Sequence, residues 1–145
     1  MINNSIPQEI EFTLTDKVYK RYDRALAAEV LNKLNVSQNS LLFNFYINYE
    51  GPFWSEFLGY ELLDVYEVIE NIEAATSTCR DSFGFLESYL VISQISSGQV
   101  LVWEAGTDMV YEVDFEGGEK LLLSGRVSPG WNSFREFLRG YFLGN

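Results

Sequence analysis

The stretch YLVISQISSGQVLVWEAGTDMVYEVDF, residues 89–115, holds three runs of strand-forming residues. The runs are Tyr89–Ile95, Val100–Ala105 and Met109–Phe115, and the polar turns SSGQ and GTD separate them. Such runs with short connections predict an antiparallel meander. Apolar and polar residues alternate in the third run, which predicts one inward and one outward face. The predicted inward residues are Met109, Tyr111, Val113 and Phe115, and the outward ones are Val110, Glu112 and Asp114.

On the carboxyl side of this meander, SFREFLRGYF (Ser133–Phe142) has the apolar spacing of an amphipathic helix. Ser133 and Glu136 form a Ser-x-x-Glu capping box, which would satisfy amides at the helix start. Between the meander and this helix, EGGEK predicts a loop and KLLLSGRV is compatible with a further strand.

On the amino side, Thr15–Leu34 is rich in helix formers, and the sequence leaves open whether this is one helix or two broken near Asp23. Ser37 is the expected cap of a second helix over about Gln38–Tyr49, which Gly51-Pro52 would end. YELLDVY (Tyr60–Tyr66) predicts a short strand, and Glu67–Arg80 fits a helix.

These elements predict one α+β domain over residues 1–145, with helices packed on one face of a mostly antiparallel sheet. The chain is 47% apolar and 16% aromatic, which is enough to build a hydrophobic core. No apolar run approaches the roughly 20 residues needed to cross a bilayer, and the first residues lack the features of a secretory signal. We therefore expect a cytoplasmic protein that does not bind membranes.

The negative charge is concentrated in the middle of the chain. Residues 41–125 hold fifteen acidic residues and only two basic ones, Arg80 and Lys120, whereas the whole chain has a net charge of −11. A field of this sign repels phosphate backbones and attracts basic proteins. We therefore expect a basic protein partner and no nucleic-acid binding.

The residue types present make catalysis and cofactor binding unexpected. The chain has no histidine, which excludes Ser-His-Asp and Cys-His arrangements and most transition-metal sites. The single Cys79 cannot form an internal disulfide, and no calcium-loop motif is present. Carboxylate pairs for a hydrolase exist only because acids are numerous. The sequence predicts no enzyme, no metal and no cofactor.

Three motifs in order resemble the SUKH superfamily: Phe45–Gly51 (FYINYEG), the central meander and the terminal SFREFLRGYF helix. The similarity covers about Val36–Phe142. The superfamily is named partly for a yeast cell-wall synthesis regulator, and its bacterial members are mostly immunity proteins of polymorphic toxin systems. The resemblance implies an α+β fold without a catalytic centre, whose function is to bind and neutralise a cognate toxin, often a nuclease.

Two groups of residues are candidates for the partner-binding surface. Around Phe53 and Trp54, aromatic side chains meet acids in a composition typical of interfaces, although both aromatics could instead belong to the core. The acidic row on and after the third strand could be a docking edge or an ordinary solvated face, and Trp131 could be exposed or cover the last helix. The candidate contacts are Phe53, Trp54, Glu56, Asp64, Glu67, Glu70, Glu112, Asp114, Glu116 and Trp131.

The prediction is thus an immunity protein that binds a basic toxin domain and blocks its active or substrate-binding surface. The alternative is a regulatory scaffold that binds endogenous proteins and has no toxin partner. The sequence predicts neither the toxin's identity nor the oligomeric state.

Overall fold

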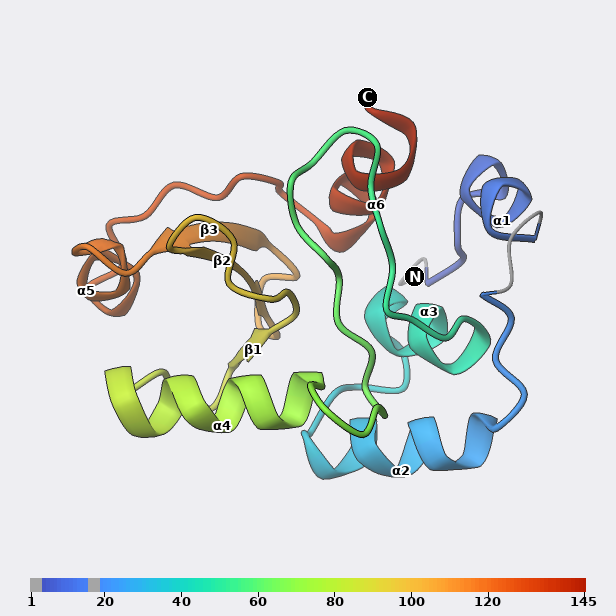
Figure 1. The fold of residues 1–145 in the computed structure, drawn as a ribbon, viewed down its shortest axis with the longest axis horizontal. Coiled ribbons are helices and arrows are strands. Elements are labelled where there is room, and N and C mark those ends of the chain that lie inside the picture. Colours follow the sequence, from blue (N-terminus) through green and yellow to red (C-terminus); the bar gives the residue numbers. More distant parts are fainter. Residues whose placement is uncertain (1–3, 16–18) are drawn as a thin grey trace.

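The central meander forms a three-stranded antiparallel sheet in the order β1-β2-β3, as predicted (Figure 1). The computed structural model describes residues 4–15 and 19–145, and within them the chain is α+β. The elements are α1 (Gln8–Thr15), α2 (Arg24–Lys33), α3 (Leu41–Asn48), α4 (Ile72–Phe83), β1 (Tyr89–Val91), β2 (Gln99–Glu104), β3 (Val110–Asp114), α5 (Gly118–Leu123) and α6 (Phe134–Leu143).

Both faces of the sheet hold buried residues, although Glu112 of β3 is exposed. Residues on one face pack against α4 and α5, and Tyr111 and Val113 lie there as predicted. Val110 was expected to face outward, but it is fully buried because the opposite face contacts the main core of the molecule. The backbone of Trp131 pairs with Val110 and closes this edge, with the Val110 amide 3.1 Å from the Trp131 carbonyl oxygen.

The first strand is shorter than the predicted Tyr89–Ile95. After Val91 the Ser93 hydroxyl accepts a hydrogen bond from the Leu101 amide (2.8 Å), so a side chain takes the place of a backbone partner in the ladder. Tyr60–Tyr66 does not form the predicted strand. Only Leu62 in that stretch forms β-bridges, one with Phe53 and one with Ser93.

The chain is broken near Asp23, which is one of the two alternatives that the sequence left open, and α3 begins later than expected. Residues 16–18 of the predicted Thr15–Leu34 helix lie outside the described residues, and α2 starts at Arg24, where the Asp23 carboxylate accepts the Leu26 amide. The cap of α3 is Ser40 rather than Ser37, since the Ser40 hydroxyl accepts the Phe43 amide at 3.1 Å. The sequence did not predict α1.

Helix α4 begins later than the sequence predicts. The predicted helix began at Glu67, but Asn71 caps α4 by accepting the Ala74 amide at 2.7 Å. An Asn side chain that binds an amide in this way fixes the helix start. Residues 67–70 therefore lie outside the helix, in the connection that precedes it.

The segment from Gly118 to Leu123 is helix α5, so the further strand considered for KLLLSGRV is wrong. The Asp114 carboxylate accepts the Glu116 and Gly118 amides (2.9 and 3.2 Å), which turns the chain into this helix. The terminal helix α6 is confirmed with its Ser133 cap on the Glu136 amide (3.1 Å).

The main core joins α1, α2, α3 and α6 around a cluster of aromatic rings. Phe45 contacts Phe53 and Phe134, with ring centroids 5.1 and 5.8 Å apart. Aromatic pairs at these separations add to the free energy gained from burial. In Figure 1, the connection between α3 and α4 runs between this helical part and the sheet, so both parts hold it in place. No described helix is long and apolar enough to span a bilayer.

Candidate partner-binding surface

The connection between α3 and α4 (residues 49–71) is anchored at its middle. Phe53 and Leu62 exchange two backbone hydrogen bonds, of 2.9 and 3.0 Å. The Tyr141 hydroxyl of α6 accepts the Leu62 amide (3.1 Å) and donates to the Tyr60 carbonyl oxygen (2.7 Å). These bonds hold the two limbs of the connection together at Phe53 and Leu62, and the part of the chain between them, residues 54–59, is largely exposed.

Large apolar side chains are exposed along this connection. Val68 is 96% exposed, Ile69 85% and Trp54 63%. Single exposed apolar residues are ordinary on a monomer, but a concentration of them marks interaction sites. We call residues 54–70 the contact segment. Its exposed apolar members are Trp54, Phe57, Tyr66, Val68 and Ile69.

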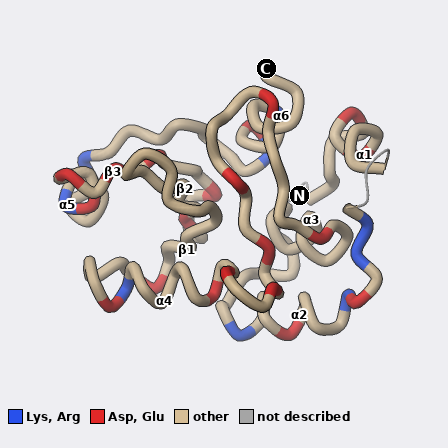
Figure 2. Tube along the Cα trace, in the orientation of Figure 1, with Lys and Arg blue, Asp and Glu red and all other residues tan. Residues whose placement is uncertain are grey.

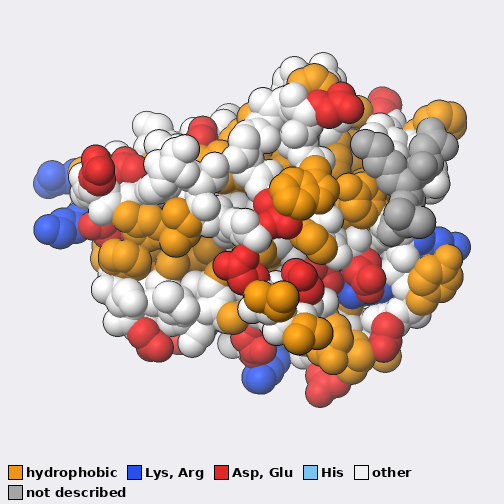
Figure 3. Space-filling view, in the orientation of Figure 1, with side chains coloured by type: hydrophobic (Ala, Val, Ile, Leu, Met, Phe, Trp, Pro, Cys, Tyr) orange, Lys and Arg blue, Asp and Glu red, His pale blue; other side chains and the backbone are white. Residues whose placement is uncertain are grey.

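Acidic residues lie between these apolar side chains. Figure 2 shows acidic positions recurring along the connection, and Figure 3 shows red and orange side chains interleaved across the middle of this face. Partial burial and the charges of Glu67 and Glu70 raise the pKa of Glu61. Glu61 is therefore close enough to Glu67 and to Glu70 to be repelled by both carboxylates. Within the described residues, Glu56, Glu61, Glu67 and Glu70 form no ion pair.

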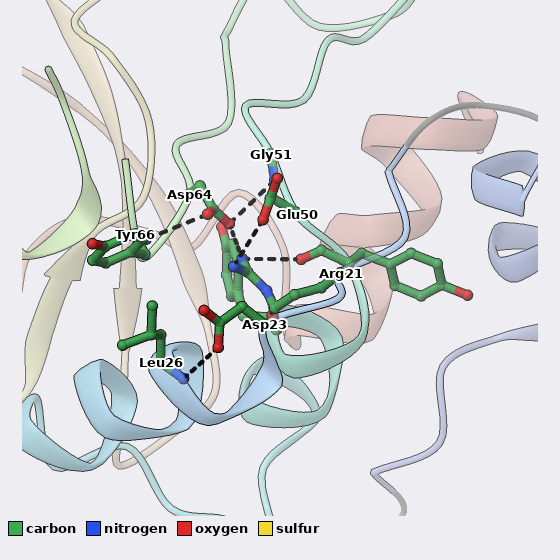
Figure 4. A network of polar contacts seen from close by, with 9 residues as sticks. Arg21, Asp23, Leu26, Glu50, Gly51, Asp64 and Tyr66 are labelled. Atoms are coloured by element: carbon green, nitrogen blue, oxygen red, sulfur yellow. Dashed lines mark hydrogen bonds and ion pairs between the residues drawn. The ribbon is translucent and has the colours of Figure 1, made fainter. Parts of the chain in front are cut away.

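A buried network holds the base of the contact segment (Figure 4). The Arg21 guanidinium pairs with the Asp64 carboxylate, and both side chains are almost completely buried. Arg21 also donates to the carbonyl oxygens of Tyr46 (2.6 Å) and Tyr49 (3.3 Å). One arginine thus joins the chain before α2 to the end of α3 and to the contact segment.

The Asp64 carboxylate shapes the chain on both sides of itself. It accepts the Gly51 amide at 3.1 Å and the Tyr66 amide at 3.3 Å, while the Asp64 carbonyl oxygen accepts the Ile72 amide at 3.0 Å. Burial raises the pKa of Asp64 from its ordinary value, against the opposing effects of Arg21 and the two amides. Asp64 therefore sets the path of residues 64–72, from which Val68 and Ile69 project.

Two of the predicted contacts are corrected by their burial. Phe53 is fully buried among the aromatic rings of the core, so a partner cannot touch it at the surface. Asp64 is fully buried as well, and its carboxylate is occupied by Arg21. Trp54, Glu56, Glu67 and Glu70 remain accessible, and all four belong to the contact segment.

β3, which carries Glu112 and Asp114, lies beside α5, and Glu116 follows it in the turn between the two elements (Figure 1). Glu112 is exposed and accepts a hydrogen bond from the Tyr60 hydroxyl (2.9 Å). The Asp114 carboxylate already accepts two backbone amides in the turn into α5, whereas the Glu116 side chain is exposed beside it. Only Glu112 is thus linked to the contact segment, through Tyr60.

Trp131 is partly buried. Its ring packs edge-on against Phe137 of α6, with centroids 5.1 Å apart, so it covers the helix rather than projecting as an anchor. Four further exposed apolar residues were not predicted from the sequence: Phe57, Tyr66, Val68 and Ile69. The signal available for the last two was Asn71, whose capping preference places the helix start after them.

Within the described residues, no group of three or more Asp, Glu, His or Cys side chains lies close enough to hold a metal ion. Comparisons of the chain with protein-family models, curated proteins and solved structures find no match.

Proposed function

We propose that this protein is an immunity protein that binds a basic toxin domain in the cytoplasm of the producing cell. One observation carries the proposal: the contact segment exposes five large apolar side chains among four acids that have no ion-pair partner in the described residues. A partner with apolar depressions bordered by Lys and Arg complements such a surface.

The two kinds of side chain have different roles in this proposal. Residues 41–125 have a net charge of −13, and this charge accelerates encounter with a basic partner. Apolar anchors such as Val68 and Ile69 leave water on binding and slow dissociation. The protein acts by stoichiometric occlusion, covering the active or substrate-binding surface of the toxin.

The proposal predicts that the gene immediately upstream encodes a protein with a toxic carboxyl-terminal domain, and it is tested by co-expressing that domain with this protein. Rescue of growth and co-purification of a one-to-one complex are expected. Substitution of both Val68 and Ile69 by Ser abolishes rescue without loss of folding. The matched control replaces Leu86, an exposed apolar residue outside the contact segment, by Ser and keeps rescue.

Failure of rescue and of complex formation by the folded wild-type protein would overturn the immunity function. The regulatory scaffold, binding an endogenous basic protein through the same surface, would then be the function to test.

A further inference from the structure

A small groove lies where the contact segment enters α4. Its volume is about 230 Å³. Small-molecule pockets have volumes of roughly 300–1,000 Å³, so this groove has room for one side chain rather than for a cofactor. Its lining residues are Ile69, Glu70, Asn71, Ala74, Ala75 and Thr78.

The lining combines aliphatic side chains, polar side chains and one carboxylate. Ile69, Ala74 and Ala75 supply aliphatic surface, Asn71 and Thr78 supply polar groups, and Glu70, the last residue of the contact segment, supplies the carboxylate. The Gln94 side-chain amide donates to Glu70 Oε2 at 2.7 Å and so orients this carboxylate without neutralising it. An aliphatic stem that ends in a cation fits this distribution of groups.

The electrostatic balance near Glu70 favours a cation. The amino terminus of α4 contributes about half a positive charge. Glu70 lines the groove, and the charges of Glu67 and Glu70 both act on Glu61, so the negative charge near the groove exceeds the half charge of the helix terminus. Glu73, in the first turn of α4, is already paired with Lys33 at 3.0 Å and adds little.

We infer that this groove receives one Lys or Arg side chain of the basic partner, with its aliphatic stem along Ala74 and Ala75 and its cation at Glu70. The exposed Val68 and Ile69 flank the entrance and contact apolar surface beside that cation. The inference rests on the proposed function, because it names the group of the partner that the contact segment binds.

The test uses the isotope-labelled full chain and no toxin. N-acetyl-arginine methylamide and N-acetyl-lysine methylamide are titrated at low salt, and amide chemical shifts are followed by NMR. For ligands of this size a dissociation constant on the order of millimolar is expected. Saturable shifts should be confined to residues 69–78 and to the neighbouring acids of the contact segment.

Two controls make the test specific. N-acetyl-norleucine methylamide has the stem without the cation and should bind more weakly. Glu70→Gln should weaken arginine binding about two- to fivefold, the range for an exposed ion pair. Asp81→Asn, which removes an exposed acid at the other end of α4, should leave binding unchanged.

Shifts spread over all exposed acids, equal binding of the norleucine compound, or no effect of Glu70→Gln would each overturn the inference. Because no toxin is present, these outcomes differ from failure of the proposed function. Groove binding without toxin rescue would point to another basic partner, and rescue without groove binding would place the contact elsewhere on the segment.

Discussion

Replacing Arg21 by Met removes the guanidinium from the buried network at the base of the contact segment. Asp64 is then a fully buried carboxylate with only the Gly51 and Tyr66 amides as partners. The carbonyl oxygens of Tyr46 and Tyr49 also lose a donor. Breaking a buried pair on one side costs about 3–5 kcal/mol, a large share of the roughly 5–15 kcal/mol that stabilises a typical domain.

The assay is urea unfolding followed by tryptophan fluorescence, with Arg24→Met as the control. Arg24 is exposed at the start of α2, so its replacement should change the free energy of unfolding by less than about 0.5 kcal/mol. The double variant Arg21→Met with Asp64→Leu should regain part of the lost stability, because no charge remains buried.

The pH dependence gives a second readout. Burial already raises the pKa of Asp64, and Arg21 lowers it, so removing Arg21 raises the folded-state pKa further. The folded-state pKa of this carboxyl is then above its unfolded-state value, which is near 4. Below the unfolded-state pKa the carboxyl group contributes stability, and this contribution is lost as pH rises through the folded-state pKa. The deficit of Arg21→Met should therefore grow from acidic to neutral pH. A loss below about 1 kcal/mol at neutral pH, or a deficit that shrinks as pH rises, would refute the assigned role of this pair.

Three further predictions concern the contact segment and its supports. Glu70→Gln removes one of the charges that raise the pKa of Glu61, so carboxyl NMR should show a lower pKa for Glu61. An unchanged pKa would contradict the proximity of Glu70 to Glu61. Tyr141→Phe removes the hydroxyl that bonds the Leu62 amide and the Tyr60 carbonyl oxygen. Calorimetry should show a loss of about 1–3 kcal/mol in the free energy of unfolding, whereas a loss near zero would show that these bonds are dispensable. Raising the salt concentration from about 0.1 M to about 1 M shortens the Debye length from about 10 Å to about 3 Å, so the rate of association with a basic toxin should fall steeply while its dissociation changes little. Association that does not depend on salt counts against electrostatic steering.

The elements predicted best from the sequence are those in which the local pattern and the tertiary environment agree. The turns at SSGQ and GTD set the meander, and Ser133 sets the start of α6 at the predicted residue. Val110 was misplaced because strand alternation indicates two faces but not whether the second is also covered. The second face is covered by the main core, which is built from helices outside the meander.

The contact segment was only partly predictable for a related reason. Trp54 and its neighbouring acids were identified from composition, whereas Phe53 and Asp64 were chosen although they are buried. Their burial follows from partners remote in sequence, the α3 and α6 rings and Arg21. No local pattern shows that an acid will meet an arginine from before α2.

Binding of the basic partner by the contact segment is tested most directly by hydrogen–deuterium exchange of this protein, alone and in complex with the co-expressed toxin domain. We expect protection on binding to concentrate in residues 54–70 and in the first turns of α4. Protection confined to β3 and α5, with residues 54–70 unchanged, would contradict this expectation and assign the interface to the acidic row at Glu112–Glu116.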